Sequence, residues 1–457
     1  MENNLILTEE LLELIEKKRF SAIKTKLIGM NSADIAVLFE ELDRENLPKI
    51  FRLLPKELAA ETFVEFDSEL QEFLIKSFSD RELKDIINEL YADDAADIVE
   101  EMPANVVSRI LRHATPEMRK DINELLKYPE DSAGSVMTTE FVNLKRTITV
   151  ADAIKQIHLT GIDKETVNTC YVTEPDRRLI GIVTLRSLII ANPDQIISDI
   201  MERNIVSVNT ESDRESVANL LKKYDLTAMP VVDAENRLVG IITIDDAIDV
   251  IEEETTEDIE KMAAILPTDK PYLKTGVFET VKARIFWLLL LMISATFTGM
   301  IISSFEEKLK LFPALIAFIP MIMGTGGNSG GQSSVTVIRG LSLGEIEFKD
   351  IFKVIFKEMK VALICGGILA AVNFIKIIVL DFFILGNLGE NFIIETLVVC
   401  FTLIFTVFIA KIVGSALPLF AQKLKLDPAV MASPFITTIV DAISLLIYFA
   451  VAALLLG

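Results

Sequence analysis

The sequence has few of the residues that build zinc sites and disulfide frameworks. Among its 457 residues are two histidines, His113 and His158, and three cysteines, Cys170, Cys365 and Cys400. Their spacing matches neither a metal-binding motif nor a paired set of disulfides, so we expect structural or surface histidines and reduced cysteines, as on a cytosolic face. The HExxH motif of zinc proteases is missing, and so is a nucleophilic serine motif with a histidine partner. We therefore do not expect an enzyme.

Positive charge is scarce in one part of the chain. The whole sequence has 45 Lys and Arg against 67 Asp and Glu. Residues 281–457 hold 13 and 11 of these, so residues 1–280 hold 32 and 56 and carry a net charge of −24. Phosphates repel such a surface, which excludes a nucleic-acid partner. Two interpretations remain: the acidity keeps this part soluble, or it binds cations.

Residues 1–130 have the pattern of short helices. Apolar residues recur at helical spacing, and a loose repeat joins small residues to an apolar stripe and acids in "DIAVLFEEL" (34–42), "LAAETFVEF" (58–66) and "DAADIVEEM" (94–102). Prolines at positions 48, 55, 103 and 116 separate the segments. We predict an all-α superhelical domain built from helix pairs.

A duplication follows this domain. The segments "RRLIGIVTLRSLI" (177–189) and "NRLVGIITIDDAI" (236–248) align without a gap, and the order β-α-β-β-α occurs twice. The pattern resembles the paired modules named after cystathionine β-synthase, the CBS pair, which usually sense nucleotides or ions. We predict an α/β CBS pair over residues 131–252, with repeats at about 137–192 and 200–252.

The resemblance to CBS modules also implies a nucleotide site. In adenosine-binding members, an Asp three residues after a Thr at the start of a helix holds the ribose. Asp246 stands at this position in the second repeat, but Ser187 replaces the Asp in the first. The resemblance therefore implies one site for ATP or another adenine nucleotide, at Asp246, and speaks against a second.

An acidic helix is predicted next, in "DDAIDVIEEETTEDIEKMAAILP" (245–267). Acids stand on nearly every turn, and like charges at i,i+4 destabilise a helix unless something neutralises them. A solvated linker helix and a cation-binding helix are both compatible with this pattern. We assign residues 253–280 to an acidic connecting helix and linker.

Residues 281–457 are predicted to cross a membrane as α-helices. Five apolar spans can be drawn, at about 285–304, 312–336, 353–380, 393–420 and 430–456. Basic residues cluster before the first span and in the second and fourth loops. The third loop, "DFFILGNLGEN", has none, and the first is mixed, with Lys308 and Lys310 beside Glu306 and Glu307. The positive-inside rule then predicts a multi-pass protein of the cell (inner) membrane, with cytoplasmic N-terminal domains and the C-terminus outside.

One stretch of the second span, "MIMGTGGNSGGQ" (321–332), is hostile to a helix. Pro320 precedes it, and we expect the glycines to loosen the turn and free backbone carbonyls, which must then be buried or line water. Asn328 and Gln332 add oxygens one turn apart, and such oxygens suit Mg2+. A pore wall and a tight seam between helices both fit; as pore-lining residues we name Gly324, Gly326, Gly327, Asn328 and Gln332.

The fifth span contains Asp441, the only acid deep in a predicted span; Asp381 and Glu395 lie near span ends. An intramembrane carboxylate costs roughly 2.5–3.5 kcal/mol and normally faces a cavity or a partner. Four further polar or helix-breaking residues share its face at spacings of three and four, which suits a water-filled path: Pro434, Thr437, Ser444 and Tyr448. Lys411 in the fourth span is predicted to lie at the cytosolic end and to snorkel.

The order of these features over essentially the whole chain resembles the MgtE family of magnesium channels. The motifs that carry the resemblance are "PMIMGTGGNSGGQ", the Asp441 stripe, the CBS pair, "EEETTEDIEKM" and "DDAADIVEEMP". The resemblance implies a homodimer in membrane lipid whose spans surround one pore. It also implies that Asp441 binds hydrated Mg2+ and that the acidic helix closes the pore as a plug.

The resemblance further implies a cytosolic Mg2+ sensor made of acids from three modules. These acids are Asp93 and Asp97 in the N-terminal domain, Asp213, Glu215, Asp225, Asp246 and Asp249 in the second CBS repeat, and Glu254, Glu257 and Asp258 in the connecting helix. Bound Mg2+ would bridge these carboxylates and close the pore.

Two alternatives belong to other classes of protein. An aspartyl intramembrane protease needs two membrane-buried aspartates, and Asp441 alone qualifies. A proton- or ion-coupled secondary transporter of Mg2+, Co2+ or Mn2+ stays open, although oxygen ligands disfavour ions that seek imidazole or thiolate. A Mg2+ uptake channel gated closed by cytosolic Mg2+ is the preferred hypothesis.

Overall fold

The computed structural model describes residues 10–268, 270, 272–306, 310, 312–379, 392–431 and 433–456. The chain divides into two compact units, Met1–Ile251 and Glu252–Gly457. Lys308 and Glu307 of the first predicted membrane loop, and the third loop "DFFILGNLGEN" with Asp381, lie outside the described residues.

The first unit begins with short helices, which confirms the predicted all-α domain. They are α2 (Phe20–Leu27), α3 (Ser32–Glu40), α4 (Leu47–Phe51), α5 (Lys56–Val64), α6 (Ser68–Ser77), α7 (Asp80–Ile87), α8 (Ala92–Glu101), α9 (Ala104–His113) and α10 (Pro116–Leu125). Pro55 and Pro103 stand at the N-caps of α5 and α9, because proline fits the start of a helix but not its interior. Asp67 and Ser79 cap α6 and α7 with side-chain hydrogen bonds.

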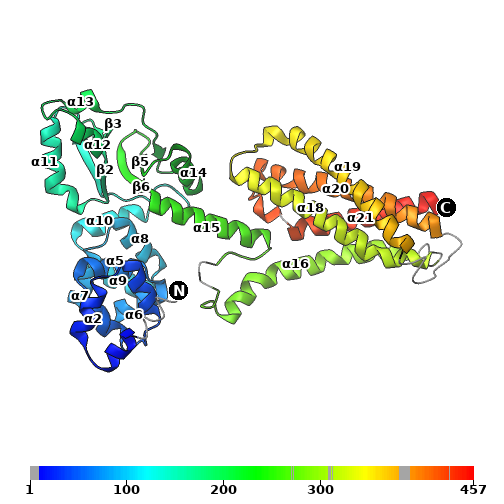
Figure 1. The fold of residues 1–457 in the computed structure, drawn as a ribbon, viewed down its shortest axis with the longest axis horizontal. Helices are drawn as coiled ribbons and strands as arrows, with labels where there is room; N and C mark the ends of the chain where they lie inside the picture. The colour runs from blue at the N-terminus through cyan, green and yellow to red at the C-terminus, as the bar shows by residue number, and fades with distance from the viewer. Residues whose placement is uncertain are drawn as a thin grey trace. The chain divides into compact units, whose positions relative to one another are not determined.

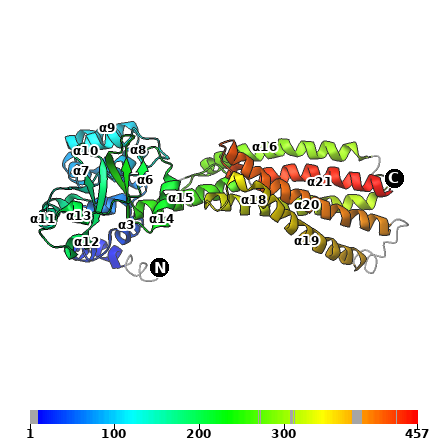
Figure 2. The same cartoon turned by 90° about the horizontal axis from the view of Figure 1, so that it is seen from above.

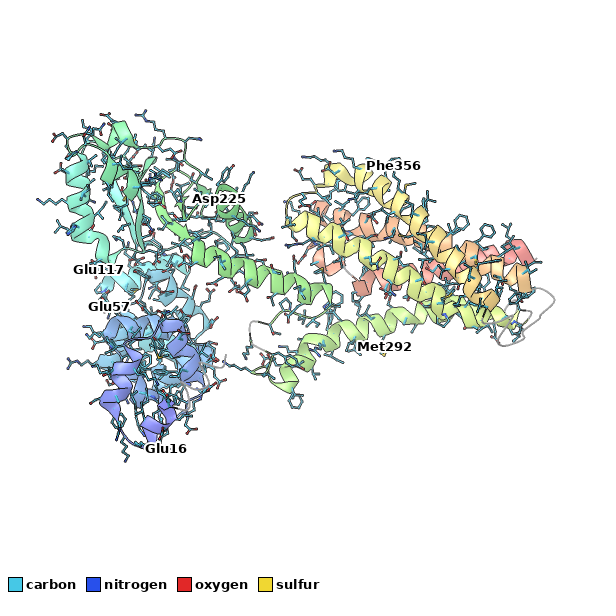
Figure 3. All side chains as sticks on the ribbon, in the orientation of Figure 1. Glu16, Glu57, Glu117, Asp225, Met292 and Phe356 are labelled. Carbon is cyan, nitrogen blue, oxygen red and sulfur yellow. The ribbon has the colours of Figure 1, made fainter. Side chains whose placement is uncertain are left out.

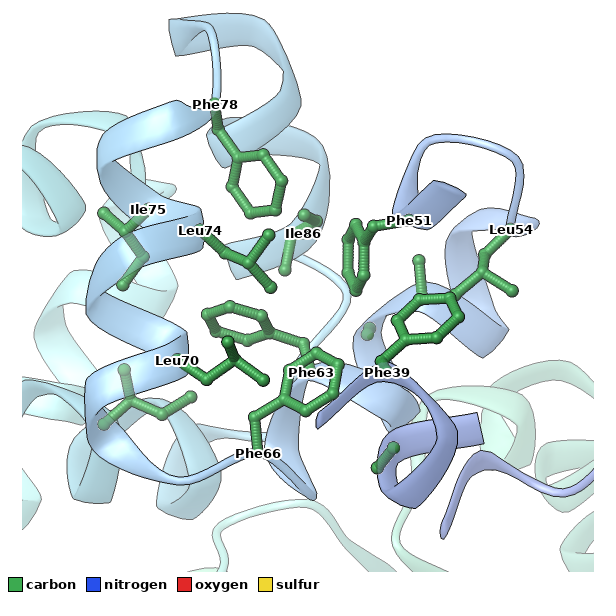
Figure 4. Close-up of a cluster of buried hydrophobic side chains, with 14 of the residues drawn as sticks. Phe39, Phe51, Leu54, Phe63, Phe66, Leu70, Leu74, Ile75, Phe78 and Ile86 are labelled. Atoms are coloured by element: carbon green, nitrogen blue, oxygen red, sulfur yellow. The ribbon is translucent and has the colours of Figure 1, made fainter. Parts of the chain in front are cut away.

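Phenylalanine side chains form the centre of this helical domain (Figure 4). Phe39, Phe51, Phe63, Phe66 and Phe78 are all buried, and the ring centroids of Phe51 and Phe78 are 5.4 Å apart. Each buried aromatic ring removes a large apolar area from water, at about 25 cal/mol per Å2. This core makes the helical domain a firm support for α8, which carries Asp93 and Asp97.

The predicted duplication is present as two three-stranded sheets. The first has the order β1 (Phe141–Lys145), β2 (Thr166–Thr173) and β3 (Leu179–Thr184), and the second has β4 (Val208–Asn209), β5 (Ala228–Val232) and β6 (Leu238–Thr243). In each sheet the first pair is parallel and the second antiparallel. The connecting helices are α11 (Val150–Thr160), η1 (Gly161–Asp163), α12 (Leu185–Ile190), α13 (Ile197–Ile200) and α14 (Arg214–Tyr224).

The acidic helix is continuous with the last helix of the second repeat. Helix α15 runs from Ile244 to Met262, so the predicted limit at residue 252 falls inside one helix. Its first part packs in the core of the first unit through Ala247 and Val250. Its last turns belong to the second unit.

The second unit is a bundle of long helices that run side by side (Figures 1 and 2). They are α16 (Val277–Ser304), η2 (Pro313–Phe318), α18 (Ile319–Ser342), η3 (Phe348–Asp350), α19 (Ile351–Ile377), α20 (Phe392–Lys423), η5 (Ala429–Met431) and α21 (Ser433–Leu456). Helices α18, α20 and α21 pack together, and α19 packs on α20. Large apolar side chains such as Met292 and Phe356 point away from the bundle, as a surface that faces lipid or another copy requires (Figure 3).

Four helices of the described residues are long and apolar enough to cross a membrane: α16, the η3–α19 segment, α20 and the η5–α21 segment. Helix α18, the predicted second span, has 24 residues but is not among them, since glycine and serine replace apolar side chains along it. The number of five spans therefore stays a prediction.

Candidate functional site

The glycine-rich stretch is an unbroken helix. Residues 319–342 form α18 without interruption, with Pro320 in its first turn, where no helical hydrogen bond is lost. The prediction that the glycines loosen the turn and free backbone carbonyls is therefore wrong. Packing by the neighbouring helices outweighs the low helix propensity of glycine.

One face of α18 is a tight seam. A Cβ atom at Gly326 would lie 2.6 Å from Ser444 Oγ and 2.7 Å from Thr406 Cγ2, and one at Gly327 would lie 2.7 Å from Thr437 Cγ2. A Cβ at Gly414 of α20 would overlap the carbonyl oxygen of Gly330. The glycines thus let α20 and α21 approach the α18 backbone, as in other small-residue membrane interfaces.

The other face of α18 is open. Gly324, Asn328 and Gln332, spaced by four residues, are exposed, and a Cβ at Gly324 would meet no atom within 4 Å. The predicted pore-lining residues thus separate into two sets. Gly326, Gly327 and Ser444 lie in the seam, whereas Gly324, Asn328 and Gln332 present a polar surface outside it.

Asp441 is half-buried on α21, and its Oδ1 atom is enclosed without a hydrogen-bond partner among the described residues. Pro434 and Thr437, on the same face, are also partly exposed. Ser444 is buried, and the buried Tyr448 donates a hydrogen bond of 2.8 Å to the carbonyl oxygen of Leu315. The predicted polar stripe is therefore accessible to water only in part: it is partly exposed from Pro434 to Asp441 and buried at Ser444 and Tyr448.

Substituting the glycines separates the two faces. We expect Gly326→Ala to destabilise the protein by about 1–3 kcal/mol, because overpacking forces neighbours apart. The matched Gly324→Ala should leave stability nearly unchanged, since space is free there. Thermal unfolding in detergent measures both. Equal unfolding temperatures would mean that the seam adjusts freely and that α18 is not held tightly.

The end of the acidic helix contacts the loop before α21. The Lys261 ammonium lies 2.6 Å from a Glu257 carboxylate oxygen and 2.7 Å from one of Asp427. Ser342 Oγ donates a hydrogen bond of 3.0 Å to Asp258, whose pKa is raised mainly by burial. Glu257 and Asp258 thus lie beside Ser342 at the C-terminal end of α18 and beside the loop before η5, which contains Asp427. The sequence alone did not point to Asp427 as their neighbour.

In the first unit, acids of α8 meet acids of α15. Ala92 and Ala96 of α8 share a buried cluster with Ala247 and Val250 of α15, and an acid adjoins each of these residues in the chain. These acids are Asp93, Asp97, Asp246 and Asp249. The two helices therefore bring carboxylates of the N-terminal domain and of the second repeat together.

Burial and like charge dominate the electrostatics of Asp93, Asp94, Asp246 and Glu165. Asp93 is only 9% exposed, and its Oδ1 has no hydrogen-bond partner within the described chain. Burial, followed by the like charge of Asp246, raises the pKa of Asp94 to about 6 and that of Glu165 to about 7. Burial also raises the pKa of Asp93 and, despite hydrogen bonds from Thr243, that of Asp246.

Two further acids join this cluster, and neither is among the site residues predicted from the sequence. Asp94 stands beside Asp93, and Glu165 comes from the loop before β2, joined to Glu140 by a backbone hydrogen bond of 2.9 Å. Desolvation and then like charge raise the pKa of Asp97 to about 7, but its side chain is exposed and solvent screens it. Asp94 and Glu165 are therefore the better reporters of the cluster.

The remaining predicted sensor acids lie elsewhere. Asp213 caps α14 by accepting a hydrogen bond of 2.9 Å from the Ser216 amide, and Asp225 ends the same helix in a left-handed conformation with φ 51°. Glu215 lies in the first turn of α14. Along an 11-residue helix, the two ends are separated by roughly 16 Å. Asp213 and Asp225 therefore cannot bind one ion together.

No cluster of three or more metal-binding side chains is close enough to hold an ion directly in the described chain. The acidic cluster still fits a hydrated cation. Mg2+ keeps several of its waters and needs one or two carboxylates. A divalent ion would satisfy the enclosed Asp93 oxygen and offset the mutual repulsion.

A cavity of about 560 Å3 lies beside the sheet of the first repeat, at the opposite end of that sheet from Thr184. It is lined by Arg146, Thr147, Glu174, Ile180, Ile196, Ser198, Met201 and Arg203. The predicted nucleotide position at Asp246 is not part of it. Acids surround Asp246, and these would repel phosphates.

Comparisons with known proteins cover each part of the chain. Residues 319–451 match the model of a divalent cation transporter family, MgtE; residues 30–131 match the MgtE intracellular N domain; and residues 133–194 and 197–253 match CBS domains. The magnesium transporter MgtE of Thermus thermophilus is 35% identical over 98% of both chains. That of Bacillus subtilis is 33% identical, over 92% of this chain and 90% of its own. Transporters, rather than enzymes, are thus the relatives that match nearly the whole chain.

Two solved structures resemble the first part of the chain. The cytosolic domain of the Mg2+ channel MgtE in complex with ATP has a TM-score of 0.51 and 35% identity, and matches 53% of this chain and 99% of its own. The soluble part of a magnesium transporter has a TM-score of 0.52 and 28% identity, and matches 56% of this chain and 99% of its own.

Proposed function

The chain belongs to the MgtE family of divalent cation transporters, and from this premise we propose that it is a Mg2+-selective uptake channel that cytosolic Mg2+ closes. The observation that carries the proposal is Asp441: a half-buried carboxylate, with an enclosed oxygen, in a bundle of apolar helices. A carboxylate is retained in such a place where it meets a cation or a water-filled path.

The path is proposed to form between two copies of the chain. Asp441 of each copy would bind hydrated Mg2+, and the exposed oxygens of Asn328 and Gln332 would contact its water shell. Apolar side chains cover the outer faces of α16 and α19, which supports burial in lipid or against a partner. We propose a homodimer with cytoplasmic N-terminal domains and the C-terminus outside, as the basic residues indicate.

Closure is proposed to follow Mg2+ binding at the acidic clusters. Without cations, the carboxylates of α8 and the second repeat repel one another, and Mg2+ would remove this repulsion. Within the second unit, Glu257, Asp258 and Asp427 form a second acidic group that Lys261 neutralises in part. An ion there would tie the plug helix to the η5 loop.

Nucleotide binding is a secondary proposal. A relative's cytosolic domain was solved in complex with ATP, and the cavity beside the first sheet is lined by Arg146 and Arg203. Ser187 and the acids around Asp246 speak against the sequence-predicted ribose site. Titration with ATP, compared between the parent and Asp246→Asn, tests it: unchanged affinity in the variant would remove Asp246 from the site.

The pH dependence of stability reports the acidic cluster. The pKa of Asp94 is higher in the folded state than in the unfolded state, so the folded state holds the proton more tightly. The free energy of unfolding is therefore highest below about pH 4 and falls as the pH rises to about 6. The difference is on the order of 3 kcal/mol for Asp94. We expect unfolding of the purified chain without divalent ions to become easier over this range.

Millimolar Mg2+ should restore the lost stability near neutral pH, and Asp94→Asn should flatten the profile. Asp163→Asn, which removes an exposed carboxylate of the same unit, is the matched control and should keep it. Scanning calorimetry from pH 4 to 8 measures the effect. A profile that Asp94→Asn leaves unchanged would show that the cluster is solvated like an ordinary surface.

Transport itself is tested in proteoliposomes. Mg2+ entry should be rapid without an imposed proton gradient, and Co2+ and Mn2+ should compete weakly. Uptake that requires a proton gradient would favour the coupled transporter instead. Equal uptake of the three ions would remove the Mg2+ selectivity from the proposal.

A further inference from the structure

A charged triad lies inside the membrane bundle. The Lys411 ammonium of α20 donates a hydrogen bond of 3.1 Å to Ser333 Oγ of α18, and this hydroxyl donates one of 2.6 Å to Glu358 Oε2 of α19. The ammonium and this carboxylate oxygen are 3.6 Å apart. Three different helices therefore meet in one polar contact.

Two residues of the triad are buried, and the third is largely so. Lys411 is 5% exposed and Ser333 2%, and the side chain of Glu358 is 13% exposed. The prediction that Lys411 snorkels is wrong, because its ammonium is buried and has partners within the bundle. Glu358 is a second, largely buried acid, although it lies near the beginning of its predicted span. A buried pair contributes little net stability, but losing one partner leaves an uncompensated charge.

The position of the triad on α18 gives it a consequence for the path. Ser333 directly follows Gln332, and an α-helix turns by 100° per residue. The triad therefore contacts the buried face of α18, whereas Gln332 lies on its exposed face. The seam beside the triad is tight, but its van der Waals contacts between glycines and the side chains of Thr406, Thr437 and Ser444 are not directional. Directional polar contacts can fix a helix register where packing alone does not.

We propose that Lys411 and Glu358, bridged by Ser333, are positioning residues for cation transport. They hold α18 in the rotation and height at which Asn328 and Gln332 face the path. The inference rests on the proposed function for its link to transport, whereas the orientation of α18 is testable without transport.

Transport variants form the first arm of the test. We expect Lys411→Met and Glu358→Gln to lower Mg2+ uptake in proteoliposomes at least tenfold. Lys411→Arg should restore it to within about threefold, because a guanidinium keeps the charge and the donors. Ser415→Ala is the matched control: Ser415 is buried on α20 one turn from Lys411, and among the described residues its hydroxyl bonds only the Ile412 carbonyl of its own helix. This control should keep wild-type uptake.

The double variant Lys411→Met/Glu358→Met separates positioning from stability. It removes both charges, so we expect wild-type dimerisation and an unfolding temperature within a few degrees of the parent, with uptake still lowered. Uptake that recovers together with the unfolding temperature would overturn the proposal, because the triad would then be only a stabilising contact.

Cysteine labelling forms the second arm. In a background without Cys170, Cys365 and Cys400, Gln332→Cys should react with a maleimide faster than Ser329→Cys, since Gln332 is exposed and Ser329 buried. Adding Ser333→Ala, or the double Met change, should reduce this ratio severalfold. An unchanged ratio would overturn the proposal. If the parent transports no Mg2+ but the ratio shifts as expected, the proposed function fails while the positioning role stands.

Discussion

Replacing Asp441 by Asn should lower Mg2+ flux by at least about tenfold while the protein stays folded. Asn has nearly the shape of Asp, so the packing of α21 against α18 is kept, but the negative charge is lost from every copy. Two unit charges 4 Å apart are worth about 4 kcal/mol at an effective dielectric of 20. Contact through a water shell is weaker, yet each 1.4 kcal/mol is a factor of ten in occupancy.

The control is Glu395→Gln, which removes a carboxylate at the beginning of α20, far along the sequence from Asp441. It should conduct at nearly the wild-type rate. Flux is measured with a fluorescent Mg2+ indicator in proteoliposomes, with size-exclusion chromatography as the test of folding. Normal flux through folded Asp441→Asn would exclude this carboxylate from the path.

If the proposed gating holds, neutralising four of the proposed sensor acids together should leave a protein that still conducts at high cytosolic Mg2+. Moving a gate from 1:99 to 99:1 needs about 5.5 kcal/mol of differential binding. One ion that binds only the closed state, at ten times its dissociation constant, contributes about 1.4 kcal/mol. One site is therefore too weak, and about four acting together suffice.

The fourfold variant combines Asp97→Asn, Asp249→Asn, Glu254→Gln and Asp258→Asn, two acids from each unit. Asp97→Asn alone should shift closure only modestly to higher Mg2+. The matched control neutralises four exposed acids outside the clusters, Glu57, Glu117, Glu211 and Glu235, with the same change in net charge. Patch recordings measure closure. If the fourfold variant closes at the wild-type Mg2+ concentration, these acids have no part in gating and are only a solvated surface.

The repeating patterns of the chain predicted its architecture because they depend on local spacing. Helical periodicity predicted the α domain, and the two aligned segments, each a strand around a glycine followed by a helix, predicted the paired sheets. The helix through "MIMGTGGNSGGQ" was mispredicted for a physical reason. Its stability comes from close contact with Thr406, Thr437 and Ser444, which lie far away in the sequence.

Charged partners were equally hidden from the sequence. Lys411 stands alone in an apolar segment, and nothing in the spacing pairs it with Glu358, 53 positions earlier. Glu165 joins the acidic cluster only because the fold brings its loop beside α8 and α15. Asp441, by contrast, was recognisable, since a single carboxylate in an apolar helix is conspicuous without any partner.

The most direct test of a Mg2+-gated Mg2+ channel is the current carried by Mg2+ through the purified protein as Mg2+ is varied on the cytosolic face alone. No proton gradient is imposed, and Mg2+ on the outer face is held constant. The account predicts a large inward current at low cytosolic Mg2+, a steep fall through the millimolar range, and no such current in Asp441→Asn. A current that is unaffected by cytosolic Mg2+, beyond the change in driving force, would contradict it.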